Sequence, residues 1–192
     1  MVALAFFWSD ERFVPQDHPD SNYLMASETL LSRIPLPDTN VHRVDTQQPD
    51  SQSAALRYES SIRSFFNTPE DAVPKFDLIL LGLGEDGHTA SLFPSSPALA
   101  GPKGLVLGLY EKSVQAYRIT FTLHLINNSR SVLFIVSGTS KARILKEVLE
   151  VPSRKEPYPA QLVRPTDGTL FWFVDQEAAS SLASVRIQGD AR

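Results

Sequence analysis

Residues 76–94 read FDLILLGLGEDGHTASLFP, and the interpretation of the whole chain starts from this stretch. Phe76–Leu81 is an apolar run between a proline and a glycine, which predicts a buried strand. Gly82–Gly87 then forms a sharp loop, and His88–Phe93 predicts one or two turns of helix that Pro94 ends. Because ligands bind at the carboxyl ends of strands in an open α/β sheet, we expect a site at this loop.

The loop brings an acid, an imidazole and a hydroxyl together. Asp86, His88 and Thr89 lie within four residues of one another, framed by Gly84 and Gly87. A neutral imidazole beside a carboxylate makes a good general base, so the pattern favours acid–base chemistry. For a lone histidine, a backbone contact at a helix start would be the better interpretation. The neighbouring Asp86 and Thr89 favour chemistry here.

The same glycines also fit a dinucleotide-binding pattern. Gly82-x-Gly84-x-x-Gly87 follows a strand, and Glu111 lies roughly where a ribose-binding acid would fall. Two features weigh against this alternative. Glu85 and Asp86 would place negative charge where a pyrophosphate needs bare N–H groups, and Pro94 cuts short the helix that should follow. A nucleotide site is therefore the weaker hypothesis.

Composition limits the class of protein. The chain has 192 residues, which suits a single domain over residues 1–192, and its formal net charge is −4. That charge gives no indication of binding to nucleic acid or to an anionic membrane surface. There is no cysteine, which excludes thiolate chemistry and cysteine-ligated metal and fits a reducing cytoplasm. No apolar run approaches the length of a membrane span.

Strand and helix patterns alternate along the chain and predict a largely parallel α/β sheet. The expected strands and extended pieces are Val2–Trp8, Val41–Val44, Phe76–Leu81, Gly104–Tyr110, Arg118–Leu123, Val132–Val136 and Leu170–Val174. The expected helices run from Asp20 or Ser21 to about Ile34, from Asp50 or Ser51 to about Phe66, and over Leu125–Ser129, Lys141–Leu149 and Gln176–Leu182. Ala55, Tyr58, Ile62 and Phe66 recur at helical spacing and predict a core-facing stripe.

Two further segments carry polar side chains at expected strand ends. Ser137–Lys141 places hydroxyls, a glycine and a lysine before a helix, which suits a phosphate or simple capping by Thr139 or Ser140. Ser9–Arg12 places charges after the first strand. For such a charged run alone, a solvated loop is the ordinary interpretation.

Several motifs occur together in one order and match nearly the whole chain. They are Phe7–Arg12 with Asp20–Tyr23, Gly82–Pro94, Arg118–Thr120 with Ile126–Asn127, Ser137–Gly138 with Lys141, Tyr158–Val163 and Trp172–Asp175. In these segments the chain resembles the 6-phosphogluconolactonase family. The Asp-Gly-His-Thr segment that ends in Leu-Phe-Pro is a specific signal, and so is the occurrence of the other motifs together in the right order.

The resemblance implies a Rossmann-like, mostly parallel sheet flanked by helices, shared with glucosamine-6-phosphate deaminases. It implies hydrolysis of 6-phospho-D-glucono-1,5-lactone to 6-phospho-D-gluconate in the oxidative pentose phosphate pathway, with no metal and no cofactor. It also implies a cytoplasmic chain whose partner is the small sugar phosphate lactone. A monomer is one expectation among the oligomeric states that the sequence leaves open.

The resemblance also implies roles for individual residues. His88 is expected to activate water, and Asp86 to orient the water or the imidazole. The other expected site residues bind or line the substrate, with Arg118 and Lys141 near its phosphate; they are Asp10, Arg12, Gly84, Gly87, Thr89, Arg118 and Lys141. Backbone N–H groups of the glycine loop are candidate donors to the developing oxyanion.

One departure from the family qualifies these expectations. Members usually begin with a strand, a Gly-Gly-Ser-Thr-Pro-like phosphate loop and a helix, and this chain is expected to be N-terminally truncated relative to them. Unpaired strand edges and exposed apolar surface would follow. The alternatives are a sugar-phosphate isomerase or deaminase of the same fold, and a catalytically impaired sugar-phosphate-binding protein.

Overall fold

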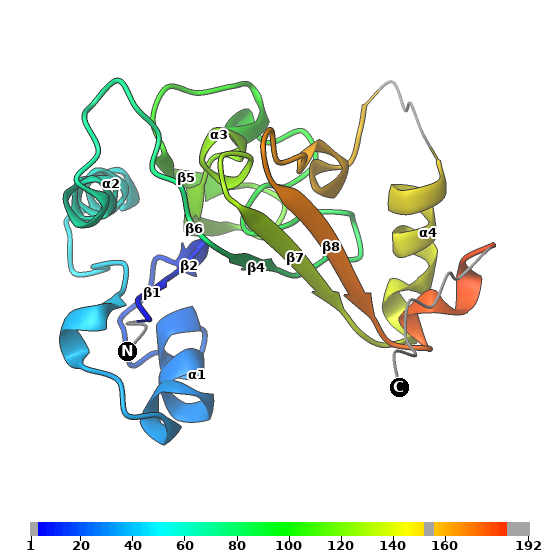
Figure 1. Ribbon diagram of the computed structural model, residues 1–192, viewed down its shortest axis with the longest axis horizontal. Coiled ribbons are helices and arrows are strands. Elements are labelled where there is room, and N and C mark those ends of the chain that lie inside the picture. The colour runs from blue at the N-terminus through cyan, green and yellow to red at the C-terminus, as the bar shows by residue number, and fades with distance from the viewer. Residues whose placement is uncertain (1–3, 152–155, 184–192) are drawn as a thin grey trace.

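The structure is a computed structural model, and it describes residues 4–151 and 156–183 (Figure 1). The description starts two residues into the strand expected from Val2, so Val2 and Ala3 lie outside the described residues. From there on, the elements alternate much as the sequence predicts.

Two parallel sheets form the α/β part of the fold. The strands of the larger sheet lie side by side in the order β4 (Ile79–Leu81), β7 (Ser131–Val136) and β8 (Thr169–Val174) (Figure 1). The smaller sheet pairs β1 (Phe6–Phe7) with β3 (Val41–His42). Helices lie beside these sheets, so the predicted α/β class with helix-flanked parallel sheets is confirmed.

A third sheet is antiparallel. It holds β2 (Asp10–Arg12), β6 (Ala116–Phe121) and β5 (Val106–Glu111) in the order β2-β6-β5. Only Lys112–Gln115 joins β5 to β6, which is far too short for the crossover that parallel strands need. The segment at Asp10 was expected to be a loop, and it is a strand because it pairs with residues more than a hundred positions away.

Four α-helices are present in the described part of the chain. They are α1 (Asn22–Thr29), α2 (Ser51–Phe66), α3 (Leu123–Ile126) and α4 (Ala142–Glu150). The Ser21 side chain caps α1 by accepting the Leu24 N–H, and Asp50 caps α2 by accepting the Ser53 N–H. Both helix starts are confirmed at the predicted capping residues.

Several predicted helix bounds are wrong. The first helix stops at Thr29 and is followed by a 3₁₀ turn at Leu31–Arg33. The helix expected at Leu125–Ser129 begins earlier, because the Thr122 side chain caps it. The last predicted helix is reduced to a 3₁₀ turn at Ala178–Ser181.

The predicted helix at His88–Phe93 is absent. The chain instead turns back on itself, with the Thr89 and Leu92 backbones exchanging hydrogen bonds and Ala90 in the left-handed region at φ 48°. The dinucleotide alternative needs a helix N-terminus at this place, so the structure removes its main support.

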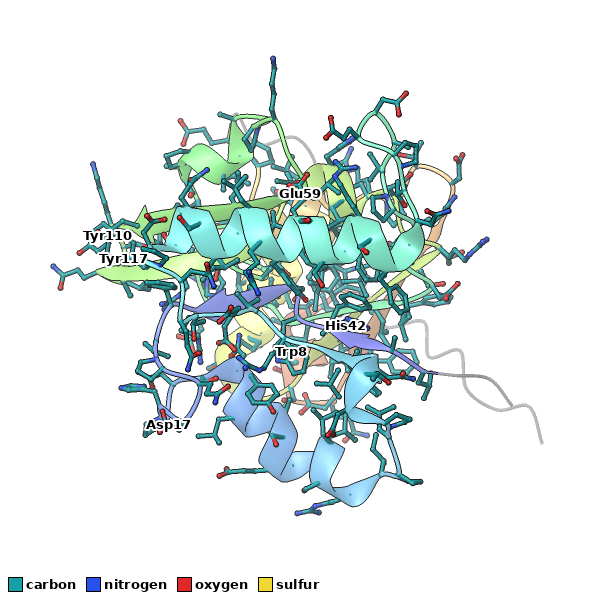
Figure 2. All side chains as sticks on the ribbon, turned by 90° about the vertical axis from the view of Figure 1, so that its left-hand side faces the viewer. Trp8, Asp17, His42, Glu59, Tyr110 and Tyr117 are labelled. Atoms are coloured by element: carbon teal, nitrogen blue, oxygen red, sulfur yellow. The ribbon has the colours of Figure 1, made fainter. Side chains whose placement is uncertain are left out.

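Helix α2 packs against β5 and β6 (Figure 2). Ala55, Tyr58 and Ile62 are buried beneath it, as their spacing predicts. The Tyr58 hydroxyl accepts the Trp8 N–H at 2.7 Å and lies 3.1 Å from the His42 carbonyl. One buried side chain therefore ties the β1–β3 sheet to the helix.

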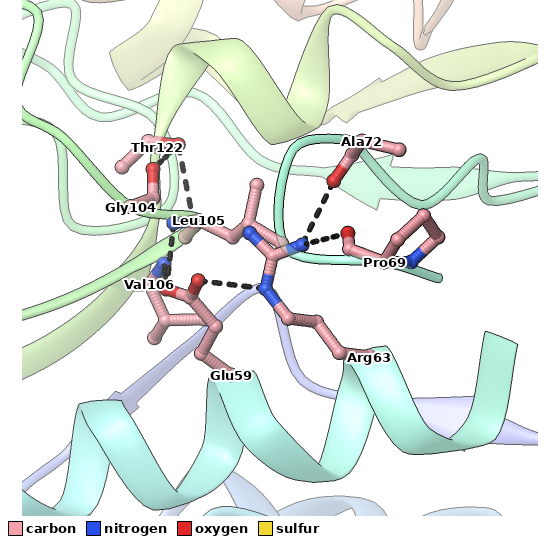
Figure 3. Close-up of polar contacts among 8 residues, drawn as sticks. All are labelled: Glu59, Arg63, Pro69, Ala72, Gly104, Leu105, Val106 and Thr122. Carbon is pink, nitrogen blue, oxygen red and sulfur yellow. Dashed lines mark hydrogen bonds and ion pairs between the residues drawn. The ribbon is translucent and has the colours of Figure 1, made fainter. Parts of the chain in front are cut away.

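A partly buried ion pair joins α2 to the start of β5. Glu59 accepts the Leu105 N–H at 2.7 Å and pairs with Arg63 at 3.0 Å (Figure 3). Arg63 in turn donates to the carbonyls of Pro69 and Ala72. Both charges are thus satisfied within the fold, which is the condition for burying them.

One face of the larger parallel sheet exposes apolar side chains. Side chains alternate along its strands, and Leu80, Ile135 and Phe173 are 53%, 53% and 62% exposed. On the opposite face Phe134 is fully buried and stacks on Trp172 with ring centroids 4.0 Å apart. Parallel sheets are normally covered on both faces, so this exposed apolar surface is unusual. No helix in the described residues is long and apolar enough to cross a membrane.

Candidate active site

The centre of the candidate site is the loop that follows β4. His88 Nδ1 lies 2.6 Å from Asp86 Oδ1, and the same oxygen accepts the His88 N–H at 3.1 Å. An ionised carboxylate can only accept, so Nδ1 carries the proton and Nε2 keeps its lone pair. The imidazole also stacks on Phe93, with ring centroids 4.3 Å apart. The ring is therefore fixed in the tautomer that a general base requires.

Gly84 is required by the position of the imidazole. A Cβ on Gly84 would lie 2.1 Å from His88 Nδ1, which no real side chain tolerates. The Gly84 N–H donates to the His88 carbonyl at 2.8 Å, so the two ends of the loop are also joined through the backbone. This glycine brings the ring against the chain rather than out into solvent.

Gly87 is held from behind by Tyr158. Its φ is +83°, and a Cβ there would lie 2.4 Å from the Tyr158 ring. The Gly87 carbonyl accepts the Ala160 N–H at 3.1 Å, and the Tyr158 hydroxyl hydrogen-bonds to Glu147 of α4. The segment at 158–160 thus links the loop to α4. Tyr158 belongs to a motif that indicated the family, but this contact with Gly87 could not be predicted because the two residues are distant in sequence.

The hydroxyl of Thr89 faces the interior. Thr89 is 1% exposed and its Oγ1 donates to the Gly82 carbonyl at 2.9 Å. Three backbone N–H groups of the loop are also engaged, those of Gly84, Gly87 and His88. These three donors close the loop on itself, so they are not free to serve as the oxyanion donors expected from this loop.

The antiparallel sheet contributes a cationic pair. Arg12 and Arg118 are directly opposite one another in the register of β2 and β6. Burial, together with the like charge of Arg12, lowers the pKa of Arg118. Arg12 donates to the Asp20 carbonyl and Arg118 to the Tyr117 carbonyl, and the described ion pairs include neither. The carboxylates of Asp10, Asp20 and Glu11 act on Arg118 in the opposite direction and favour its charged form. Two guanidinium groups side by side, neither of them in one of these ion pairs, are candidate partners for an anion.

Asp10 stands on the same face of this sheet. Its Oδ2 accepts the Ser91 hydroxyl at 2.7 Å, which joins β2 to the turn after His88. Burial raises the pKa of Asp10 above its usual value of 3.8, against the opposing effects of Ser91 and of the charges of Arg12, Arg118 and His88. These charges are therefore within electrostatic reach of one another. Ser91 was not predicted, because its partner is 81 residues away.

Glu11 points to the face of the antiparallel sheet opposite Asp10, and its role is structural. Its carboxylate accepts the N–H groups of Arg12, Asn22 and Tyr23 at 2.7–2.8 Å, which caps the start of α1. It is 2% exposed, and burial raises its pKa. The charged run at Ser9–Arg12 is thus a short strand, with Glu11 buried on one side and Asp10 partly buried on the other, rather than a solvated loop.

Lys141 approaches the loop from the carboxyl end of β7. Its Nζ lies 3.9 Å from Glu85 Oε1, next to Asp86 in the chain. The capping predicted for Thr139 or Ser140 is wrong, because these residues form a 3₁₀ turn and α4 has no side-chain cap. The Gly138 N–H is bound by the Asp175 carboxylate at 3.0 Å, so that N–H is not free for a phosphate. Lys141 itself is what this segment offers to an anion.

A cavity of about 880 Å³ lies away from this loop, along α2. Its charged side chains include Glu59 and Arg63, which already satisfy each other. Among the described residues, no group of three or more His, Asp or Glu side chains is arranged to hold a metal ion. The loop at His88 therefore stays the candidate site.

Fold and site together define a class: an α/β protein with an imidazole–carboxylate pair at the carboxyl end of a parallel strand, and a pair of arginines on the adjoining antiparallel sheet. Residues 2–172 match the family described as glucosamine-6-phosphate isomerases/6-phosphogluconolactonase. The chain belongs to this family.

Individual proteins that are similar to the chain support the same family. The chain is 45% identical to the 6-phosphogluconolactonase of a Synechocystis strain, over 92% of this chain and 72% of that protein. The structure of the Trypanosoma brucei 6-phosphogluconolactonase superposes with a TM-score of 0.78 at 33% identity, covering 94% of this chain and 74% of that one. A monomeric glucosamine-6-phosphate deaminase superposes at 0.73 with 22% identity, over 92% of this chain and 74% of the deaminase, which shows a shared fold.

Proposed function

We propose that this chain hydrolyses 6-phospho-D-glucono-1,5-lactone to 6-phospho-D-gluconate in the oxidative pentose phosphate pathway, in the cytoplasm. The observation that carries the proposal is the 2.6 Å contact between His88 Nδ1 and Asp86, which leaves Nε2 as a proton acceptor. The names of the relatives supply the substrate, and the chemistry of the side chains is consistent with it.

The reaction begins with water. Nε2 of His88 removes a proton as the water oxygen attacks the lactone carbonyl carbon, and Asp86 stabilises the imidazolium that forms. Because the loop N–H groups of Gly84, Gly87 and His88 are engaged, the charge that develops on the carbonyl oxygen needs other donors.

The substrate phosphate supplies binding energy away from the reacting carbon. A phosphate dianion needs charge-assisted donors, which Arg118 and Lys141 provide, with Arg12 beside Arg118. Anchoring the phosphate at a distance orients the lactone carbonyl against His88. Asp10 lines the same face of the antiparallel sheet.

The test is a steady-state assay with freshly prepared lactone, after subtraction of the spontaneous rate measured in buffer. We expect a protein-dependent rate. Two other outcomes would redirect the assignment. Ammonia release from glucosamine 6-phosphate without lactone hydrolysis would make the chain a deaminase, and tight calorimetric binding of 6-phosphogluconate without turnover would make it a binding protein.

A further inference from the structure

Asp10 lines the candidate site, but its carboxyl group takes no part in the proposed mechanism in which His88 acts as the base. Its Oδ2 is fixed by the Ser91 hydroxyl at 2.7 Å, and Ser91 is 1% exposed. Ser91 is itself held by its N–H, which donates to Thr120 Oγ1 at 3.2 Å, and Thr120 is the residue opposite Asp10 in the sheet. The carboxyl group is therefore locked in orientation from one side.

The second oxygen of Asp10 is open. No hydrogen bond in the described part of the chain involves Oδ1, and this atom is not among the buried polar atoms without a partner. A carboxyl group with one oxygen bound by a hydroxyl and the other facing solvent presents a single position for a proton. That position lies on the face of the sheet that carries Arg12 and Arg118.

The charged groups around Asp10 are those of Arg12 and Glu11 on its own strand, Arg118 on β6 and His88 on the loop. None of the ion pairs in the described chain joins Asp10 to either arginine. Burial outweighs the effect of the cations and raises the Asp10 pKa. A bound phosphate dianion would neutralise Arg12 and Arg118, and so would raise this pKa further.

We propose that Asp10 is the general acid of the lactone hydrolysis and protonates the ring oxygen as it leaves, while Ser91 is a positioning residue that orients the carboxyl group. This inference rests on the proposed function. It assigns the two proton transfers to two groups in different surroundings, a base on the loop after β4 and an acid on strand β2.

The step balances as follows. Attack of water on the carbonyl carbon gives one proton to His88 and forms the tetrahedral intermediate. Collapse of the intermediate breaks the bond between the carbonyl carbon and the ring oxygen, whose electron pair takes the proton from Asp10. The proton on His88 then returns to Asp10, directly or through solvent, and the product acid loses its own proton to water.

The experiment compares pH profiles of kcat for the whole chain and for Asp10→Asn, with the buffer rate subtracted at each pH. Asparagine keeps the size and can still accept from Ser91, but it carries no proton to donate. We expect kcat to fall about 100-fold, as for the loss of a general acid. We also expect the decrease of kcat at high pH, the falling limb of the profile, to disappear in Asp10→Asn. Calorimetry should show that this variant still binds 6-phosphogluconate.

Ser91→Ala tests the positioning role. The hydroxyl donates to the ionised carboxylate and favours that form, so its removal should move the falling limb to higher pH. The matched control is Ser113→Ala, which removes a similar hydroxyl contact with a carboxylate, Glu111, on the β5–β6 hairpin. The control should leave the profile unchanged.

The outcomes separate the two claims. Absence of any protein-dependent rate in the unmodified chain would overturn the proposed function, and the role of Asp10 with it. A normal rate in the unmodified chain that Asp10→Asn leaves within twofold, with the falling limb intact, would overturn only the assignment of the acid. An unshifted limb in Ser91→Ala would remove Ser91 from the mechanism.

Discussion

Two neighbouring glycines in the loop have different environments, and this makes the position of His88 testable. Gly84 lies so close to the imidazole that a Cβ on this residue would be 2.1 Å from His88 Nδ1. A Cβ on Gly82 would have no atom within 4 Å. Neither has the positive φ that would strain a larger residue. The two positions therefore form a natural pair of variants.

Gly84→Ala should displace the His88 ring and reduce kcat/KM about 100-fold, because a shift of about 1 Å at a reacting group has an effect of that size. Gly82→Ala should leave kcat/KM within about twofold. Steady-state kinetics checks both, and circular dichroism confirms that both variants fold. Equal effects of the two substitutions would show that the imidazole does not lie against Gly84.

Among the helices, strands and loops, the features that could be predicted from the sequence are those that depend on short-range patterns. The caps Ser21 and Asp50 and the buried stripe of α2 were predicted because each depends on contacts within a few residues. The same locality explains why the His88 loop was found as a candidate site, since Asp86 and His88 are two positions apart.

The elements that were predicted wrongly depend on contacts between residues that are distant in sequence. The turn at Thr89–Leu92 replaces a predicted helix in a segment where Ser91 bonds to Thr120 and Asp10. Strand β2 forms because β6 pairs with it. Such pairings leave no periodic pattern in either segment, so the antiparallel sheet and the contact between Ser91 and Asp10 could not be predicted.

The cap of α1 by Glu11 leads to a prediction about stability. Glu11→Gln would turn an NH₂ group toward the N–H of Asn22 or Tyr23, and should lower the free energy of unfolding by about 1–3 kcal/mol at neutral pH. Chemical denaturation measures this change. Glu28→Gln on the exposed side of α1 is the control and should have little effect.

The same carboxyl group should also show in the pH dependence. Burial raises the folded-state pKa of Glu11 above its usual 4.5, so the folded chain binds the proton more tightly than the unfolded chain. The stability contributed by that proton is fully present below pH 4.5 and is lost as the pH rises through the folded-state pKa. The stability difference between the unmodified chain and Glu11→Gln should therefore shrink over that range, and a growing difference would contradict the direction of the shift.

At the scale of the whole molecule, the bare face of the larger sheet matters most. The chain spans 72% of the length of its Synechocystis relative, and the expectation of exposed apolar surface agrees with the exposure of Leu80, Ile135 and Phe173. Exposed apolar patches on strands promote association between molecules. We therefore expect this face to lower the solubility of the protein.

Replacing Leu80, Ile135 and Phe173 together with threonine should raise the soluble yield and change the free energy of unfolding by no more than about 1.5 kcal/mol, because surface changes are individually small. By contrast, Phe134→Ala on the buried face should cost about 3–5 kcal/mol. Centrifugation assays and denaturation curves give the two quantities. A triple variant that unfolds would show that another polypeptide surface covers this face in solution.

The most direct measurement of the central claim is the lactone hydrolysis rate of the chain beside that of His88→Ala, at neutral pH and with the spontaneous rate subtracted. The account predicts a protein-dependent rate that falls by about 100-fold or more in the variant, since a positioned general base contributes at least that factor. Equal rates in the two proteins, with both folded, would contradict it, because the imidazole held by Asp86 would then have no part in the reaction.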